Sequence, residues 1–443
     1  MNFALLAQGA AHLVVKRYAG PFWIRRQWLK KTQWFNESEL EGIQLKLLKQ
    51  LIHHCYSTVP YYKCLMDERG IKVESINSLE DIKQFPVLTK KDVLQAGDSI
   101  ISTKYPKWLM RIAYTGGTTG TPLLIWRDLF SIGSNHAFFQ RQKDWAGVGL
   151  RDRCAYLTGR LVVRPDRTDK RLYSYDPFMK ELILSTYHLS IDTAKEYAEV
   201  IKRYRVTAID GYPSAVYLVA KTCFDSGIEL KLQSVLTSSE TLTESMRNMI
   251  SRAFQCEVYD YYGSAERTSI IHTCEHGSYH IIPEYGLTEL IPLGGSDNNK
   301  CRIISTGFWN LAMPFIRYET GDIVRTTDEK CICGRQYPVV KSVSGRKADV
   351  IKTPSGREFG AAILTHLLYG TDHIVESQIV QDELGHIIIK YVPSERFSEK
   401  DLMAFQQLII RHLPQEMRVE LRRVEVIKRT DNGKIRPVVS EIG

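Results

Sequence analysis

The chain is organised around an eight-residue loop of glycine, threonine and proline, Thr115-Gly116-Gly117-Thr118-Thr119-Gly120-Thr121-Pro122. The glycines let the backbone turn tightly and approach a ligand closely, and the threonine hydroxyls supply hydrogen-bond donors. These properties favour phosphate oxygens as the ligand. The common nucleotide loop ends in Gly-Lys-Ser/Thr, whereas Gly120 precedes Thr121, so the cation must come from elsewhere in the chain. The competing interpretation is a solvated surface loop.

Outward from this loop, short β-rich runs alternate with amphipathic helical stretches. Arg111–Tyr114 is predicted to be a strand that leads into the loop, and Thr89 is predicted to be the N-cap of a short helix before it. Further strands are predicted near Cys154–Leu157, Thr207–Asp210, Ser234–Leu236 and Val258–Tyr261, with helices at Thr193–Tyr204, Ala215–Asp225 and Leu242–Phe254. The pattern predicts an α/β fold with a mostly parallel sheet.

Three of these strands run directly into polar or aromatic turns. The turns are Gly211-Tyr212-Pro213-Ser214, Thr237-Ser238-Ser239-Glu240 and Tyr262-Gly263-Ser264-Ala265-Glu266. Ligands of open α/β sheets bind beyond the carboxyl ends of the strands. We therefore expect these turns to form the edge of a pocket, in which Tyr212, Pro213 and Phe138 could line a site for an aromatic acyl group. Core packing explains Phe138 equally well.

The outer parts of the chain have different textures. From Glu37 to about Arg69 the apolar spacing predicts a core-facing helix that Pro60 interrupts. After Glu266, alternating strands such as Tyr279–Pro283 and Phe315–Tyr318 predict an antiparallel β subdomain over about 270–345. The last hundred residues are predicted to contain hairpins at Pro354–Gly356 and Asp382–Gly385, helices at Phe359–Tyr369 and Lys400–Leu413, and strands around Val424–Ile427. We therefore expect a large domain over 1–345 and a small mobile α+β domain over 346–443.

Composition narrows the class of protein. A chain of 443 residues is too long for one hydrophobic core, and 44% hydrophobic with 25% charged residues is typical of globular proteins. The net charge of +9 without basic runs suits anionic small substrates and does not favour nucleic acid. Nine scattered cysteines indicate a reducing compartment, so we expect a cytoplasmic protein.

The first 31 residues combine aromatic and basic side chains. They show no signal peptide and no membrane span, because the apolar run is short and lacks a basic leading segment. Residues 1–31 could lie on an anionic membrane surface as a peripheral contact. We favour the alternative, in which this segment packs onto its own domain.

With these motifs in this order, the chain resembles the adenylate-forming superfamily, and most closely its phenylacetate–CoA ligase branch with capsule-biosynthesis and F390 synthetase-like proteins. The resemblance runs from about Leu51 to the C-terminus. It rests on the Gly/Thr loop and on four further segments, Tyr262–Glu266, Tyr318-Glu319-Thr320-Gly321-Asp322, Gly345-Arg346-Lys347-Ala348-Asp349 and Arg429–Arg436.

The resemblance implies a role for each segment. Thr115 to Gly120 would clamp phosphate. The segment Tyr261-Tyr262-Gly263-Ser264 would lie beside the nucleotide, and Glu266, two residues after it, would hold magnesium. Asp322 takes the ribose hydroxyls, and Arg346 holds ribose or phosphate from an interdomain hinge. Ala348 stands where the family has the first of two hinge aspartates, so the pivot differs. Ser239 and Glu240 would lie near adenine or the acyl group, or serve as a helix N-cap.

Lys434 is the catalytic candidate. Joining a carboxylate to a nucleotide brings an oxyanion to a polyanion, so catalysis must neutralise charge and hold the reacting atoms in line. Lys434 stands in a glycine-bearing turn, Asp431-Asn432-Gly433-Lys434, and the family resemblance places the catalytic lysine there. A lysine ammonium suits a phosphate as a point charge. The alternative for an isolated lysine is a solvated surface side chain.

Cys274, His280, Cys331 and Cys333 form a candidate zinc site. Cys331-Ile332-Cys333-Gly334 is a tight knuckle, and Cys274 with His280 or His276 would complete a tetrahedral set of three thiolates and one imidazole. Some phenylacetate–CoA ligase relatives carry such a zinc, according to the resemblance. The alternative is a group of small buried cysteines without metal.

The function predicted from the resemblance is two-step ligation. ATP and a small-molecule carboxylic acid give an acyl-adenylate, and coenzyme A then takes the acyl group, with Mg²⁺ as the metal of the nucleotide. A second hypothesis keeps the adenylation but transfers the group to an amine or hydroxyl, as in polysaccharide biosynthesis or in F390-type nucleotidyl transfer. A third is a nucleotide-binding protein without turnover.

Overall fold

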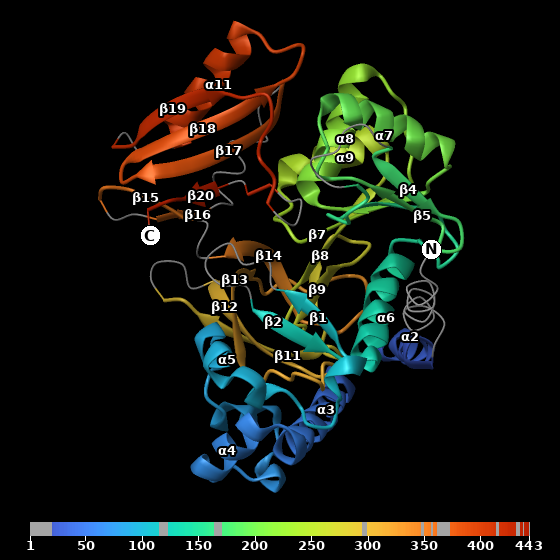
Figure 1. Ribbon diagram of the computed structural model, residues 1–443, viewed down its shortest axis with the longest axis vertical. Coiled ribbons are helices and arrows are strands. Elements are labelled where there is room, and N and C mark those ends of the chain that lie inside the picture. Colours follow the sequence, from blue (N-terminus) through green and yellow to red (C-terminus); the bar gives the residue numbers. More distant parts are fainter. Residues whose placement is uncertain are drawn as a thin grey trace. The chain divides into compact units, whose positions relative to one another are not determined.

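The computed structural model describes residues 20–114, 123–163, 171–294, 299–346, 350–355, 358–360, 373–412, 416–430, 435–436 and 438–442. The chain divides into two compact units, one of residues 1–145 with 261–343 and the other of 146–260 with 344–443 (Figure 1). The Gly/Thr loop, Ala348, Asp349 and Lys434 lie outside the described residues. The predicted boundary between residues 345 and 346 stays a prediction.

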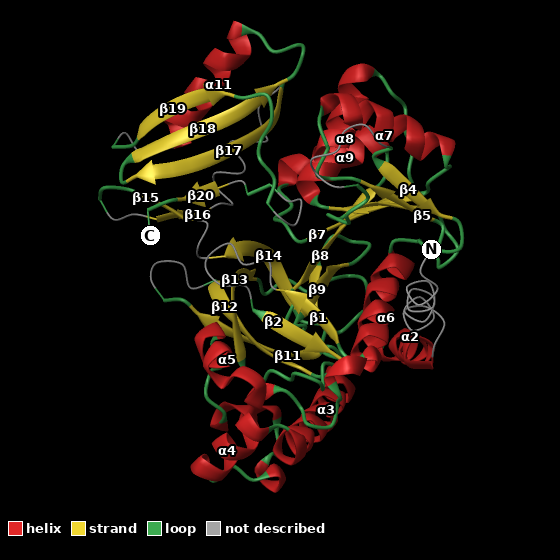
Figure 2. Cartoon of the chain, in the orientation of Figure 1, coloured by secondary structure: helices red, strands yellow, loops and turns green. Residues whose placement is uncertain are grey.

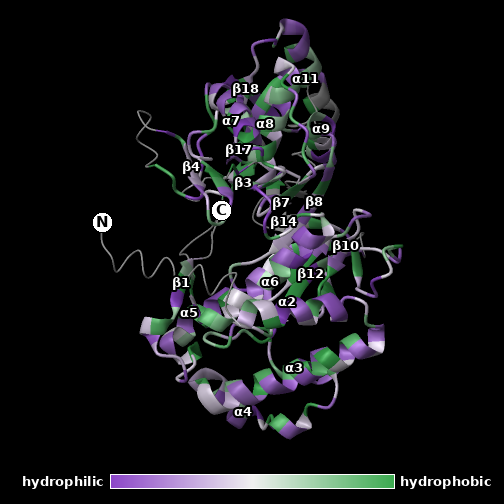
Figure 3. Cartoon of the chain, turned by 90° about the vertical axis from the view of Figure 1, so that its right-hand side faces the viewer, coloured by the Kyte–Doolittle hydropathy of each residue, from purple (hydrophilic) through white to green (hydrophobic). Residues whose placement is uncertain are grey.

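Helices of the first unit begin and end where local chemistry dictates. They are α2 (Gly20–Thr32), α3 (Glu37–Thr58), α4 (Pro60–Arg69), α5 (Lys90–Ala96) and α6 (Leu129–Trp145). Asn36 caps α3 in a capping box with Glu39, and Pro60 at the first position of α4 separates the two helices. Thr89 caps α5, as predicted. Polar and apolar patches alternate along α3, as an amphipathic helix requires (Figure 3).

Strands of the first unit pair antiparallel. β1 (Arg111–Tyr114) pairs with β2 (Leu124–Arg127), so the Gly/Thr loop joins two neighbouring strands. A second sheet has the order β11-β12-β13-β14-β10-β9-β8. Its strands are β8 (Glu257–Gly263), β9 (Ile270–Thr273), β10 (Tyr279–Ile281), β11 (Gly286–Pro292), β12 (Lys300–Gly307), β13 (Tyr318–Thr326) and β14 (Val339–Arg346). The antiparallel subdomain is confirmed, but Phe315–Arg317 precede β13 instead of belonging to a strand.

The second unit contains the predicted parallel sheet. Its order is β4-β5-β3-β6-β7-β8, in which β5, β3, β6 and β7 run parallel and β4 is antiparallel to β5. The strands are β3 (Cys154–Leu157), β4 (Tyr173–Asp176), β5 (Glu181–Leu184), β6 (Ala208–Gly211) and β7 (Ser234–Ser238), and the helices are α7 (Ile191–Arg203), α8 (Pro213–Ser226) and α9 (Glu244–Phe254). Every predicted strand and helix of this parallel-sheet region is present, whereas β4 and β5 were not predicted. Their apolar residues, including Leu182 and Leu184, are buried with those of α8 in one core.

The C-terminal part of the second unit is α+β, as predicted (Figure 2). β15 (Val350–Lys352) pairs with β16 (Glu358–Gly360), and a four-stranded sheet has the order β19-β18-β17-β20. Its elements are β17 (Ile374–Glu383), β18 (His386–Pro393), α11 (Glu399–His412), β19 (Arg418–Arg423) and β20 (Val438–Ser440). The predicted strand at Val424–Ile427 was wrong, because β19 ends at Arg423. The predicted helix at Phe359–Tyr369 was wrong at its start, where β16 continues to Gly360, and the rest lies outside the described residues.

Across the described part of the chain, no helix is both long enough and apolar enough to cross a bilayer.

Candidate functional site

Two sequence motifs of the first unit meet through reciprocal hydrogen bonds. Tyr262 donates its hydroxyl to Oδ2 of Asp322 at 2.8 Å, and Tyr318 donates its hydroxyl to Oε1 of Glu266 at 3.1 Å. Each motif therefore supplies a tyrosine that holds the carboxylate of the other motif. Burial raises the pKa of Tyr262 well above its usual value, and the nearby Asp322 carboxylate adds to this, so the phenol keeps its donor proton.

Glycines fit the Glu266 motif into the β subdomain. A Cβ at Gly263 would lie 2.3 Å from the hydroxyl oxygen of Tyr261, so only glycine leaves room for that ring. Behind the motif, a Cβ at Gly286 would lie 2.2 Å from the Thr268 carbonyl oxygen, and one at Gly307 would lie 2.4 Å from that of Arg267. The chain next to Glu266 is thus packed against two glycines of paired strands, which fixes its path.

Two arginines beside Glu266 were not singled out from the sequence. Arg127, the last residue of β2, donates through Nη2 to the Ala265 carbonyl oxygen. Arg267 donates through Nη1 to Oγ of Ser131 at 3.2 Å. Burial and, to a lesser extent, the nearby Arg267 lower the pKa of Arg127 to about 9, yet the guanidinium stays charged at neutral pH. The Gly/Thr loop contains no basic residue, which indicated that a cation must come from elsewhere in the chain. This signal did not identify Arg127 or Arg267.

The predicted acyl-pocket residues fall into two groups. Phe138 is 1% exposed and packs edge-on against Tyr285 at 4.9 Å between ring centroids, which favours the core-packing alternative. Tyr212 and Pro213 lie at the start of α8 in the second unit, where Tyr212 donates its hydroxyl to the Thr158 carbonyl oxygen at 2.8 Å. The structure does not bring Phe138 together with these residues inside one unit.

Ser239 and Glu240 follow β7 in the second unit. Ser239 has a φ of 70°, a conformation that costs energy for a side chain other than glycine and that occurs frequently at functional sites. The Glu240 carboxylate accepts hydrogen bonds from two backbone N–H groups, those of Ser214 at 3.1 Å and of Ile435 at 3.2 Å. The N-cap of the next helix is Thr243, so Ser239 and Glu240 do not cap α9. Arg346 is the last residue of β14.

The four predicted zinc ligands converge in the first unit. Their ligand atoms all lie within 4.8 Å of one another, with 3.5 Å between the sulfurs of Cys274 and Cys331 and 3.5 Å between Cys333 Sγ and His280 Nε2. Tetrahedral zinc with Zn–S bonds of about 2.3 Å separates two ligand sulfurs by about 3.8 Å. The donor set therefore fits zinc. His276 instead donates its backbone N–H to Cys274 Sγ at 3.4 Å.

A buried polar network lies next to the cluster of Cys274, His280, Cys331 and Cys333. Glu284, which is fully buried, accepts from Arg141 at 2.9 Å, from the Tyr337 hydroxyl at 2.7 Å and from Thr32 of α2 at 2.7 Å. The Tyr337 ring lies 6.1 Å from that of His280. These bonds compensate a buried carboxylate and attach α2 to α6 and the β subdomain. For residues 20–31, the structure therefore agrees with packing onto the chain's own domain.

Comparison with known proteins follows from this fold. Residues 351–441 match the family model of the CapK C-terminal domain. Protein CapK of Staphylococcus aureus is 25% identical over 83% of this chain and 81% of its own length. A phenylacetate–coenzyme A ligase of Thermus thermophilus is 24% identical over 68% of each chain.

Solved structures share the fold. A 2-hydroxyisobutyryl-CoA ligase in the postadenylation state, in complex with 2-HIB-AMP, superimposes with a TM-score of 0.70 at 17% identity, covering 96% of this chain and 94% of that one. The anthranilate CoA ligase AuaEII in complex with anthranoyl-AMP gives a TM-score of 0.51 at 14% identity, covering 75% and 67%. The chain is thus a homologue of CapK and phenylacetate–CoA ligases and has the fold of CoA ligases, which confirms the predicted resemblance.

Proposed function

We propose that this homologue of CapK and of phenylacetate–CoA ligases activates a carboxylic acid with ATP as an acyl-adenylate and then transfers the acyl group to the thiol of coenzyme A. The observation that carries the proposal is the pair of hydrogen bonds in which the carboxylate of each motif accepts from a tyrosine of the other motif. Glu266 and its tyrosine partner are 52 residues apart in sequence, and Asp322 and its partner are 60 apart, yet both hydrogen bonds join the same two motifs.

The chain's own groups have complementary roles in this proposal. Asp322 accepts the ribose hydroxyls, because an ionised carboxylate offers two acceptor oxygens. The buried guanidinium groups of Arg127 and Arg267 add positive charge beside Glu266, which favours a bound polyanion. Lys434 supplies the ammonium that neutralises charge between the acid and the α-phosphate. The Gly/Thr loop joins β1 to β2 and contributes backbone and hydroxyl donors to the phosphates.

Magnesium fits the Glu266 side of the site. A carboxylate oxygen is the hard ligand that this ion prefers. The hydroxyl of Tyr318, the first residue of β13, donates to the Glu266 carboxylate and orients it. When bound, magnesium would neutralise phosphate charge and hold the polyphosphate in one geometry. The other metal in the proposal is zinc at the cysteine cluster, where four protein ligands leave no position for a substrate, so its role is structural.

An amine or hydroxyl acceptor is the second candidate, and the extent of similarity favours keeping it. CapK aligns with 83% of this chain and the Thermus ligase with 68%, and the C-terminal domain matches the CapK model. The part of the chain that carries Lys434 is thus the part that resembles CapK, so thiol transfer does not follow from the ligase relatives alone.

A panel of aryl and small aliphatic carboxylic acids tests the proposal. Pyrophosphate release is measured with ATP and Mg²⁺, with and without coenzyme A, and products are identified by mass spectrometry. Release that depends on one acid, together with a thioester, supports the proposal. Acid-dependent release with product only on an added amine or hydroxyl supports the second candidate. ATP binding without release for any acid would support a protein without turnover.

A further inference from the structure

Glu240 joins two segments that are far apart in sequence. Its Oε2 accepts the N–H of Ser214 at 3.1 Å and its Oε1 accepts the N–H of Ile435 at 3.2 Å. Ser214 is the second residue of α8, and the helix begins at Pro213, which has no N–H. The Ser214 N–H is therefore one of the helix donors without an intrahelical acceptor, and a carboxylate there also interacts favourably with the helix dipole.

Ile435 is the residue that follows Lys434. Its side chain is 3% exposed and lies in an apolar cluster with Val392 and Ile427. The side chain thus fixes Ile435 to the C-terminal sheet, while its N–H is fixed by Glu240. A residue held on both sides has little freedom, so the position of the Ile435 backbone N–H depends on the Glu240 carboxylate.

A second contact holds the other end of the same segment. Arg429 and Glu376 form a buried ion pair in which each side chain is 6% exposed. The same Nη2 atom of Arg429 donates to the Leu189 carbonyl oxygen at 3.4 Å. Arg429 and Ile435 therefore both contact the part of the second unit that contains α7 and α8.

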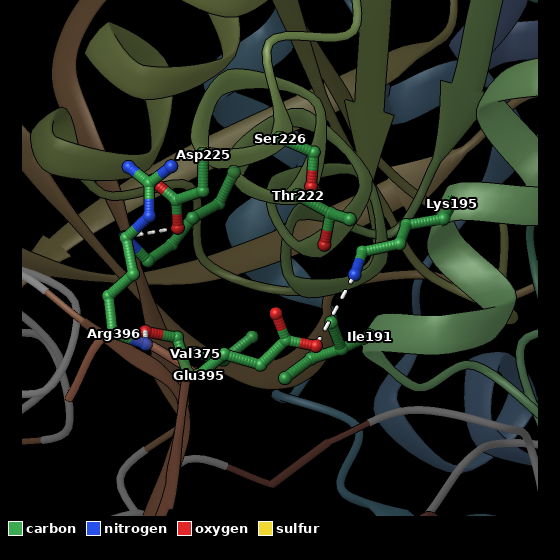
Figure 4. A pocket seen from close by; sticks show the side chains of 10 residues that line it. Ile191, Lys195, Thr222, Asp225, Ser226, Val375, Glu395 and Arg396 are labelled. Atoms are coloured by element: carbon green, nitrogen blue, oxygen red, sulfur yellow. Dashed lines mark hydrogen bonds and ion pairs between the residues drawn. The ribbon is translucent and has the colours of Figure 1, made fainter.

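Another contact in this unit provides a matched comparison. The close-up in Figure 4 shows Lys195 of α7 reaching toward Glu395, with 3.4 Å between Nζ and Oε1. Their side chains are 38% and 77% exposed, so this pair adds little stability. It also joins the α7–α8 region to the C-terminal part, but it lies far in sequence from Lys434. A change at Glu395 therefore alters another carboxylate contact between these two regions without altering the Glu240–Ile435 contact.

We propose that Glu240 is a positioning residue whose carboxylate holds the Ile435 N–H at the N-terminus of α8, and that adenylation depends on this attachment at the residue that follows Lys434 in the sequence. The carboxylate group is needed, because each of its two oxygens accepts from a different backbone N–H. An amide at this position has one acceptor oxygen, so one backbone N–H would face an NH₂ group and lose its partner. The effect on adenylation rests on the function proposed above, whereas the effect on the Ile435 N–H does not.

Hydrogen exchange of the Ile435 amide tests the attachment without any substrate. In Glu240→Ala, which removes both acceptor oxygens, we expect exchange at Ile435 to become about tenfold faster, which corresponds to the loss of a hydrogen bond to a charged group. Exchange at Val419 in β19 should stay unchanged, as should exchange at Ile435 in the control Glu395→Ala. Unchanged exchange at Ile435 in Glu240→Ala would overturn the proposal.

Separate assays of the two half-reactions test the consequence for Lys434. In Glu240→Gln, acid-dependent pyrophosphate release should fall about tenfold, whereas the Kd of Mg-ATP and the transfer from a synthetic acyl-adenylate to coenzyme A should stay unchanged. A weakened Kd that accounts for the whole loss would place Glu240 on the nucleotide and contradict the proposal. Equal losses in both half-reactions with a lower Tm would reduce Glu240 to a structural contact. If no acid supports pyrophosphate release in the wild-type protein, the proposed function fails, and exchange at Ile435 still decides whether Glu240 holds the segment.

Discussion

The carboxylate of Glu266 accepts a hydrogen bond from a side chain, the Tyr318 hydroxyl, whereas the carboxylate of Glu240 accepts from the backbone N–H groups of Ser214 and Ile435. A single tyrosine on a neighbouring strand orients Glu266 while its chain path is fixed by glycine packing. The two backbone donors of Glu240 instead come from separate segments. The difference teaches that similar carboxylates near the ends of strands can be held in different ways, one oriented by a side-chain hydroxyl and one joining two segments through their backbone N–H groups.

Lys434→Ala should have the largest effect, because it removes the ammonium proposed to neutralise charge during adenylation, at the position before Ile435. We expect acid-dependent pyrophosphate release to fall by about 10² to 10³, as is typical of one electrostatic contact to a transition state. The Kd of Mg-ATP, measured by calorimetry, should change little, since Glu266 and Asp322 remain. An unchanged release rate would remove Lys434 from the mechanism.

Cys331→Ser tests the candidate zinc site in the first unit without changing Glu266 or Asp322. Wild-type protein purified without added zinc should contain about one zinc per chain, because the donor set is complete. The variant should lose the metal, and its Tm should fall because binding of a structural metal contributes folding free energy. Cys64→Ser is the control, since Cys64 is exposed on α4 and is not part of the cluster. Wild-type protein without zinc would end the idea of a metal site.

Asp322→Asn tests the second carboxylate of the two motifs, the one that accepts from Tyr262. Removing the charge should raise the KM for ATP by about tenfold to a hundredfold, because hydrogen bonds to charged groups contribute about 1.5–3 kcal/mol. The maximal rate at saturating ATP should fall less. Comparison with 2′-deoxy-ATP sharpens the test, since the variant should discriminate less between the two nucleotides than the wild type does. Equal discrimination would mean that Asp322 does not contact the ribose.

Tyr318→Phe should have the smallest effect, because it removes only the hydroxyl that orients Glu266. We expect a loss of about 1 kcal/mol in transition-state binding, or roughly fivefold in kcat/KM for adenylation, with a higher requirement for Mg²⁺. Tyr56→Phe on α3 is the matched control, because that tyrosine is exposed. A variant with the wild-type Mg²⁺ dependence would show that the hydrogen bond does not matter for the metal.

The elements of the fold could be predicted wherever periodicity and caps agreed. Cys154–Leu157 was predicted to the residue, and Thr89 and Pro60 marked helix ends correctly. The strand at Val424–Ile427 failed because its apolar residues resemble those of a strand, whereas Ile427 lies beyond the end of β19 and packs with Val392 of β18 and Ile435. β4 and β5 were not predicted, although they have four residues each, as β3 does.

Site residues could be predicted only where the residue types and their spacing indicate a specific chemistry. The Cys274 cluster was found because thiolate spacing has few structural alternatives. The contact from Glu240 to Ile435 had no signal in the sequence, since backbone N–H groups are the same at every residue and the two positions are 195 apart. Arg127 was missed for a related reason, because its acceptor is the Ala265 carbonyl.

Glu266→Gln in the acid panel tests the central claim most directly. The account predicts that wild-type protein releases pyrophosphate with at least one carboxylic acid, and that Glu266→Gln releases it about a hundredfold more slowly with a shifted Mg²⁺ dependence. Wild-type rates and an unchanged Mg²⁺ dependence in this variant would contradict the claim that the paired carboxylates form the nucleotide site.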